Sequence, residues 1–453
     1  MAELPNHGQA VFPREGIKGQ LQRQAAIAAD LCRLWGEHRL AHGQQRRARL
    51  LLVGMGDARQ RKRREAVPIG MGVLLDGGNI RAKGQDNASA IGGTRAEDIE
   101  FSTTVRGEVY NRRQGGSITI NGGTFKGQMS DEAYNKNSIA CGIYAAWKDN
   151  IIVNDGTFDI ERGVGVLCRG GKVTIKGGTF TTTDPDTKKG CVGDSRIVVP
   201  CQTVYVDKAS QYPDYENATI EISGGKFSDD SCKDYLAEGY GIGRTYIESK
   251  NVWYTEVAEA VSEYDGMKYS SLQTAIEASE DATKEITILK DMEVSQLTVY
   301  LENKVTINLN GKNVNITGYE PNCTGVNIDG GSLTIKGSGS FGDSAQKNVN
   351  PLFYVNVGAS LTIEGDASYY SANVCAYAYH WNSEIYINGG KWYGSETYTL
   401  NKYNTNQEAI ISVTGGEFYK YNPAASHSEN PVANFVADGY GVVKDGDWYR
   451  VVK

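Results

Sequence analysis

Proline, histidine and long apolar runs are all scarce in this chain. Only 10 of its 453 residues are proline and only 5 are histidine. The histidines are scattered along the chain, so the sequence does not predict a histidine-based catalytic or metal site. No stretch reaches the about 18 consecutive apolar residues that a membrane-spanning helix needs. We therefore expect no membrane span.

Cysteine is present, but not in a metal-binding pattern. No Cys-x-x-Cys pair occurs among Cys32, Cys141, Cys168, Cys191, Cys201, Cys232, Cys323 and Cys375. Structural zinc and redox sites depend on such spacings, so we expect no metal or other cofactor. Cys191 and Cys201 could close a loop disulfide, but the sequence favours small buried thiols for them.

Negative charge is concentrated in the body of the chain. The net charge of −7 combines +7 over residues 1–70 with −14 over the remainder. An acidic surface repels a phosphate backbone, so the body is not expected to bind nucleic acid. Residues 1–70 are predicted to form a basic, poorly ordered or helical extension. No secretory signal is recognisable there, because the short apolar run at 50–55 has basic residues on both sides.

Glycine and tyrosine are abundant, with 54 and 27 residues. Many of the glycines belong to a repeated stretch whose best example is VTIKGGTF at residues 173–180. Near-copies or degenerate relatives begin at Ile118, Ile151, Ile220, Val305, Leu333, Leu361, Ile385 and Ile411. In each, apolar residues alternate with polar ones, which predicts a strand with one buried face. The glycines predict a sharp corner after the strand.

The spacing of the repeats predicts an architecture. From Val305 to Ile411 they recur at intervals of 28, 28, 24 and 26 residues. This is the range of solenoid proteins, in which each repeat buries its apolar face against the next. A hairpin protein would place successive strands closer together. The sequence therefore predicts an all-β fold, a parallel β-helix.

The repeat pattern also predicts which side chains form the core. The inward aliphatic positions are Ile120, Val153, Ile175, Ile222, Ile307, Ile335, Ile363, Ile387 and Val413. The aromatic residue after each corner is assigned to the core as well, at Phe125, Phe158, Phe180, Phe227 and Phe418.

The repeats fall into two tandem units, which we place at residues 71–258 and 259–453. The second unit begins with a helix candidate capped by Ser271, whose Leu272, Ala275 and Ile276 share one apolar face. We expect this short helix to cover the open end of the first coil, since an unpaired end invites aggregation. The tails of the units also match, because DYLAEGY at 234–240 echoes NFVADGY at 434–440.

The xTIxGGTF repeats resemble those of right-handed parallel β-helix proteins of the pectate-lyase-like superfamily. They are most similar to the uncharacterised, repeat-rich surface proteins of anaerobic gut bacteria. The resemblance covers the chain from about residue 73 to its end. It implies a right-handed β-helix and an extracellular or cell-surface location. It does not fix a function, since this fold carries enzymes, adhesins, viral spikes and inert stalks.

Catalytic groups of such folds are hard to find in the sequence. The Trp-Ile-Asp-His and Arg-x-Pro-x-x-Arg motifs of the lyases are absent. A glycosidase needs two or three carboxylates at fixed separations. The best candidates are Asp184, Asp186 and Asp194 near Arg196, in a turn-rich loop where solvated charge is the simpler interpretation. Asp329 and Asp366 stand beside glycine corners, where a turn role is simpler still.

An aromatic cluster is the best candidate for a binding site. Alternation along YAYHW places Tyr377, Tyr379 and Trp381 on one face of a strand. If the small residues face inward, these rings form an outward patch beside Trp392 and Tyr393 and suit the apolar faces of sugars. The alternative is an inward aromatic ladder, which the sequence favours on balance.

Three classes of function remain open. The first is a non-catalytic surface protein, adhesin-like or carbohydrate-binding, whose partner is a polysaccharide or host glycan. The second is a polysaccharide lyase or glycoside hydrolase. The third is a phage tail or head-fibre protein, which would be a trimer rather than a monomer.

Overall fold

The computed structural model describes side chains at residues 117–127, 141–145, 149–183, 200–208, 215–318, 320–403, 408–428 and 432–453, and several further strands by backbone alone. The chain divides into two compact units, residues 1–171 with 181–218, and residues 172–180 with 219–453. Apart from one strand, the predicted extension over 1–70 lies outside the described residues. So do Asp184, Asp186, Asp194 and Arg196. The division into 71–258 and 259–453 stays a prediction.

The described residues are mostly strands in long, largely parallel sheets. The only α-helix among them that spans more than one turn is α3 (Leu272–Glu277). The prediction of an all-β fold is therefore confirmed. None of the described helices is both long and apolar enough to cross a bilayer.

The first unit contains two parallel groups of strands. Its strands are β1 (Leu50–Gly54), β2 (Met71–Leu75), β3 (Asn79–Gly84), β4 (Ser89–Gly92), β5 (Thr103–Val105), β6 (Glu108–Tyr110), β7 (Ser117–Met129), β8 (Ala140–Ala145), β9 (Asn150–Glu161), β10 (Gly163–Cys168), β13 (Cys191–Gly193), β14 (Ile197–Val199) and β15 (Val204–Val206). In one group β7 lies between β2 and β9, and β3 also pairs with β7. In the other, the order is β4, β8, β10, β15.

Corresponding repeat residues pair with each other in this unit. Ile120 lies opposite Val153 in the parallel ladder of β7 and β9, and Phe125 lies opposite Phe158. The two phenyl rings stack with centroids 4.7 Å apart. The corner between strand and ring is made by glycines, and Gly123 adopts φ of 119°, which favours glycine.

The second unit is longer and begins with a short parallel group. Its first strands are β11 (Lys172–Ile175), β12 (Thr179–Thr183, which runs on into the first unit), β16 (Thr219–Ile222) and β17 (Gly225–Phe227). β11 pairs with β16 so that Ile175 lies opposite Ile222, and Phe180 stacks on Phe227 at 5.1 Å. A hairpin of β18 (Tyr240–Ile247) and β19 (Val252–Glu259) follows, and then β20 (Ser262–Tyr264) and β21 (Met267–Tyr269) precede α3.

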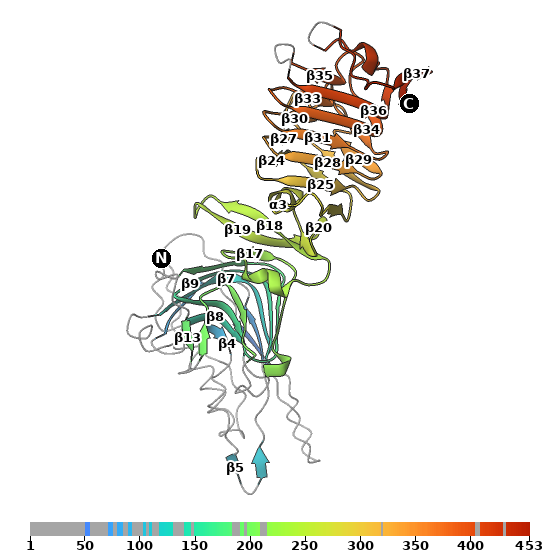
Figure 1. Cartoon of the computed structure of the whole chain (residues 1–453). Helices are drawn as coiled ribbons and strands as arrows, with labels where there is room; N and C mark the ends of the chain where they lie inside the picture. The colour runs from blue at the N-terminus through green and yellow to red at the C-terminus, as the bar shows by residue number, and fades with distance from the viewer. Residues whose placement is uncertain are drawn as a thin grey trace, which may run out of the picture. The chain divides into compact units, whose positions relative to one another are not determined.

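After α3 the strands recur in threes, one for each of three parallel columns (Figure 1). The first column is β22 (Ile286–Ile288), β25 (Lys304–Asn308), β28 (Ser332–Lys336) and β31 (Ser360–Ile363). The second is β23 (Met292–Val294), β26 (Lys312–Ile316), β29 (Gly339–Gly342) and β32 (Ser368–Tyr370). The long β34 (Glu384–Tyr393) and β36 (Ile410–Tyr419) continue both of these columns.

The third column is a separate sheet of short strands. It consists of β24 (Leu297–Val299), β27 (Val326–Ile328), β30 (Phe353–Val355), β33 (Ala376–Ala378) and β35 (Leu400–Lys402), all parallel. The chain then ends with a hairpin of β37 (Gly441–Asp445) and β38 (Trp448–Val452). Every strand from β22 to β33 thus pairs with its counterpart one repeat later.

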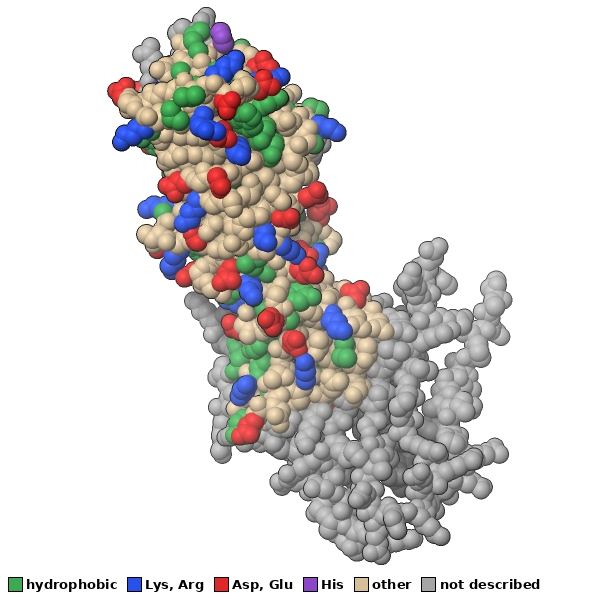
Figure 2. Space-filling model, turned by 90° about the vertical axis from the view of Figure 1, so that its right-hand side faces the viewer, with side chains coloured by type: hydrophobic (Ala, Val, Ile, Leu, Met, Phe, Trp, Pro, Cys, Tyr) green, Lys and Arg blue, Asp and Glu red, His purple; other side chains and the backbone are tan. Residues whose placement is uncertain are grey.

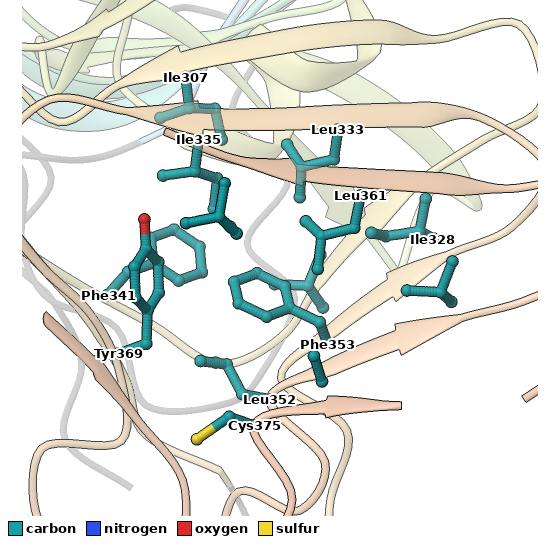
Figure 3. Close-up of a cluster of buried hydrophobic side chains, with 14 of the residues drawn as sticks. Ile307, Ile328, Leu333, Ile335, Phe341, Leu352, Phe353, Leu361, Tyr369 and Cys375 are labelled. Carbon is teal, nitrogen blue, oxygen red and sulfur yellow. The ribbon is translucent and has the colours of Figure 1, made fainter. Parts of the chain in front are cut away.

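The core lies between the three columns (Figure 3). All nine predicted aliphatic positions are fully buried, and Ile307, Ile335 and Ile363 lie opposite one another in the ladders of β25, β28 and β31. Burying one such side chain stabilises the fold by about 1.5–3 kcal/mol. The five predicted core phenylalanines are buried too. Both predictions are confirmed.

The helix α3 begins as the sequence predicts. The Ser271 side chain accepts a hydrogen bond from the Thr274 N–H, and Leu272, Ala275 and Ile276 are buried. These three residues belong to the same hydrophobic cluster as the strands that follow. The helix therefore packs its apolar face on the beginning of the three columns.

The cysteines divide into two kinds. Five of them are buried thiols outside any disulfide, namely Cys141, Cys168, Cys232, Cys323 and Cys375. Burial raises the pKa of the Cys141 and Cys232 thiols to about 12, so these thiols are protonated and unreactive at neutral pH. Cys201, however, is disulfide-bonded, so the preference for a thiol there was wrong. It lies two residues after β14, whose antiparallel partner β13 begins at Cys191.

Candidate functional site

The third column carries aromatic rings on its outer face. Along β30 and β33 burial alternates, so that Phe353 and Val355 face the core opposite Ala376 and Ala378. Side chains at the intervening positions must therefore point outward. Tyr354 lies opposite Tyr377 at these positions.

Four tyrosines and one tryptophan make up what we call the aromatic surface: Tyr354, Tyr377, Tyr379, Tyr403 and Trp381. The ring of Tyr379 is central, with centroids 4.8 Å from Tyr354, 5.4 Å from Tyr377 and 5.4 Å from Tyr403. Tyr354 and Tyr377 meet edge to face at 5.8 Å. Aromatic rings prefer such arrangements to a face-to-face sandwich. Tyr354, Tyr377 and Tyr379 stay half-buried in this cluster, and Tyr403 is exposed.

The phenol of Tyr354 stays protonated at neutral pH. Burial, a hydrogen bond with Tyr379 and its charge together raise the pKa of Tyr354. A neutral phenol both donates and accepts hydrogen bonds. The surface therefore combines apolar ring faces with polar groups that could contact hydroxyls.

Trp381 lies in a well-defined turn after β33. Its side chain is 62% exposed, while its backbone N–H donates to His380 Nδ1 at 3.0 Å and its carbonyl accepts from Gly358 N–H at 3.2 Å. The Ser383 hydroxyl holds the same turn by donating to the His380 carbonyl. The ring is thus exposed but its backbone is fixed, which lowers the entropy lost on binding a ligand.

The structure separates Trp392 from this surface. Trp392 is fully buried, stacks on Tyr369 at 4.6 Å, and its Nε1 donates to the Gly389 carbonyl at 3.1 Å. The reason is its position, because it is the aromatic residue after the glycine corner of IYINGGKW and lies in register with Phe418. Its placement on an exposed patch was wrong.

Tyr393 is outward but belongs to a different sheet. It stacks with Tyr370 at 4.6 Å and contacts Trp448 edge to face at 5.4 Å. Its ring lies in the second column, while Tyr377 lies in the third. Of the five predicted site residues, Tyr377 and Tyr379 are in ring contact. Trp381 is joined to them through the His380 ring, whose centroid lies 6.0 Å from that of Tyr379 and 5.8 Å from that of Trp381.

Sequence reasoning missed Tyr354 and Tyr403. Tyr354 lies in FYV one repeat before the AYA of β33, so alignment of the third strands would have paired it with Tyr377. Tyr403 follows β35 at the position that Tyr379 holds after β33, since Tyr377 pairs with Asn401. The third strand of each repeat was missed because no glycine corner marks it in the sequence.

Charged candidates for catalysis are not assembled among the described residues. Asp329 is exposed and accepts a hydrogen bond from the Asn356 amide at 3.4 Å, as expected of a turn residue. No three or more His, Cys, Asp or Glu side chains in the described ranges gather where they could hold a metal ion.

A buried ion pair in the first unit was also missed. Arg169 and Asp207 directly follow the paired residues Cys168 and Val206 of β10 and β15, and Arg169 Nε lies 2.9 Å from Asp207 Oδ2. Both side chains are almost fully buried. The guanidinium also lies 5.9 Å from the centre of the Tyr144 ring. Such a pair is costly to break, since a single remaining charge would be buried without compensation.

Comparison with known proteins adds no relative. No family model, no curated protein and no solved structure matches the chain. The resemblance of its repeats to pectate-lyase-like proteins therefore stays a prediction, and function has to be argued from the residues.

Proposed function

We propose that the chain is a non-catalytic surface or secreted repeat protein that binds carbohydrate through its aromatic surface. The architecture proposed with it is a right-handed parallel β-helix of the pectate-lyase-like kind. Support for this architecture comes from the three strands that recur in a fixed order and pair in parallel with their counterparts. Such a stack offers long, rigid outer faces on which binding residues keep fixed positions.

The observation that carries the proposal is the exposed ring of Trp381, which the His380 ring connects to the tilted tyrosines. Tyr and Trp rings present an apolar face together with a polar group, which matches the alternating C–H and hydroxyl surfaces of a sugar ring. Adjacent parallel strands lie about 4.8 Å apart, so rings on neighbouring repeats together span one or two sugar units. An open surface buries little of its ligand, so we expect affinities of roughly millimolar to micromolar.

The test is a glycan-array screen followed by titration with whichever glycan is captured. Trp381→Ala removes the most exposed ring of the surface and should weaken binding at least tenfold, while the melting temperature stays unchanged. Trp253→Ala is the matched control, because Trp253 on β19 is 60% exposed but lies outside the aromatic surface. It should bind as the wild type does.

Three outcomes count against the proposal. If the wild-type chain captures no glycan, carbohydrate binding is not its function. If Trp381→Ala and Trp253→Ala bind equally well, glycan binding lies elsewhere on the chain. New reducing ends or unsaturated uronates released from the captured glycan would identify an enzyme instead.

A further inference from the structure

The second unit contains the same C-terminal motif twice. DYLAEGYGIG at residues 234–243 corresponds to NFVADGYGVV at residues 434–443. Leu236 forms a parallel bridge with Ile222, and Val436 forms one with Val413. The matching glycine adopts φ of 81° at Gly239 and 83° at Gly439. The two tails therefore share local conformation as well as sequence.

Each tail ends in an antiparallel hairpin that pairs with the last parallel strand before it. Phe227 of β17 lies opposite Thr255 of β19, and Phe418 of β36 lies opposite Tyr449 of β38. In both hairpins this contact uses the second strand. The first strands, β18 and β37, are thus equivalent. Each pairs along one edge with the second strand of its hairpin, and its other edge faces away from the hairpin.

In the first tail that other edge is occupied. β18 pairs in parallel with β21 at Ile242 and Tyr269, and the Ser270 N–H donates to the Ile242 carbonyl at 2.9 Å. The close approach depends on Gly241, because a Cβ there would lie 2.7 Å from the backbone of Lys268. β21 belongs to the lead-in segment β20–β21–α3, which begins the next set of repeats.

In the second tail the same edge has no strand partner among the described residues, where β37 pairs with β38 alone. Gly441 occupies the position of Gly241, yet a Cβ there would have no atom within 4 Å. Val442 takes the position of Ile242. The glycine that allows a partner strand to approach β18 is thus also present in β37, where no partner strand lies among the described residues.

We infer that the free edge of β37 docks the lead-in segment of another strand-repeat module. The occupant has the chemistry of residues 262–278: a short strand that pairs in parallel with Val442, then a serine-capped helix with an apolar face. The lead-in segment of a second copy of this chain is not available, because it is already paired with its own β18. Docking adds a strand to a sheet edge, a common mode of peptide recognition.

The edges of β18 and β37 differ at one position, and this difference provides a further test of the inference. Val443, which is 53% exposed, stands where β18 has Gly243. A Cβ at Gly243 would lie 2.8 Å from the Ser270 hydroxyl oxygen, which can rotate away, and 3.3 Å from the Ser271 Cβ, which would have to shift by a few tenths of an ångström. Val443 therefore weakens docking without preventing it, and Val443→Gly should tighten it.

The test uses the full chain and a fluorescent peptide of residues 262–278, with a scrambled peptide as the blank. Fluorescence anisotropy should show saturable binding to the wild type, and hydrogen exchange should show protection of the Val442 amide. Gly441→Ala should weaken binding at least tenfold with an unchanged melting temperature, since that Cβ meets only solvent in the free chain. Val443→Gly should strengthen binding several-fold.

Three results would overturn the inference. One is the absence of saturable binding to both the wild type and Val443→Gly at millimolar peptide. Another is equal binding by Gly441→Ala and the wild type. The third is self-association of the full chain through β37 that Gly441→Ala abolishes while the peptide does not bind, because the edge would then pair with itself.

Discussion

At the scale of single residues, two tryptophans of one repeat have opposite environments. Trp381 is largely exposed in a turn, whereas Trp392 is fully buried in a stack between Tyr369 and Phe418. The difference follows from position, because Trp392 comes two residues after a glycine corner and Trp381 follows the short strand β33. Residue type alone therefore does not say which ring can meet a ligand.

The aliphatic ladder provides a first prediction at this scale. Ile335 lies between Ile307 and Ile363 and is fully buried, so Ile335→Ala should lower the free energy of unfolding by about 2–5 kcal/mol. Thr334→Ala, on the outer side of the same strand, should change it by less than about 1 kcal/mol. Urea denaturation of both variants measures the difference, and equal effects would mean that the strand faces the other way.

Asp343 provides a second prediction, through pH. Burial alone would raise the pKa of this carboxyl, but hydrogen bonds from the backbone N–H groups of Asn348, Lys347, Val349 and Ala345 lower it overall. A lowered pKa means that the folded state favours the charged form. The resulting stability is fully present above the pKa of the unfolded chain and is lost as pH falls through the folded-state pKa.

Asp343→Asn should therefore cost about 1.5–3 kcal/mol at neutral pH, the usual loss for hydrogen bonds to a charged group. The difference from the wild type should shrink as the pH falls below about 4, near the ordinary pKa of Asp. Denaturation curves at pH 7 and pH 3 test this. A difference that stays constant between the two would show that the charge of Asp343 does not matter.

At the scale of elements, the strands that precede a glycine corner could be predicted from the sequence, whereas the strands of the third column could not. Alternation and a glycine pair mark strands such as β34, whose register with β36 the repeats anticipate. The third column has strands of only three residues and no glycine corner, so the repeat that pairs Tyr354 with Tyr377 was not recognised in the sequence. Trp392 was placed on the surface because many aromatic residues lie near it in the sequence. The rule that the aromatic residue after a glycine corner is buried, as Phe418 is, would have placed it in the core.

The helix α3 supports a prediction about a cap. Ser271 accepts from the Thr274 N–H, so Ser271→Ala should destabilise the fold by about 0.5–2 kcal/mol. Ser271→Asp keeps an acceptor at the helix start and should lose little or none of that stability. Thermal unfolding of the two variants is the measurement. Equal losses of stability in both variants would mean that the Ser271 hydroxyl stabilises the fold by an interaction other than helix capping.

At the scale of the whole chain, charges of both signs are interspersed on the described residues. Figure 2 shows this mixture of acidic and basic side chains over one face. Ion pairs such as Lys290–Glu259 and Arg450–Glu417 join some of the opposite charges. Exposed pairs contribute little to stability, about 0–1 kcal/mol each. They do leave the aromatic surface as the most distinctive outward feature of the three columns.

The most direct measurement is the glycan affinity, per folded molecule, of Trp381→Ala and Trp392→Ala, with unfolding measured on the same samples. Trp381→Ala should lose binding and keep its stability. Trp392→Ala should lose about 3–5 kcal/mol of stability, because a large core side chain is removed, while its folded fraction binds normally. The reverse pattern, in which Trp392→Ala loses binding and Trp381→Ala loses stability, would contradict the assignment of Trp381 to the exposed aromatic surface and of Trp392 to the buried stack.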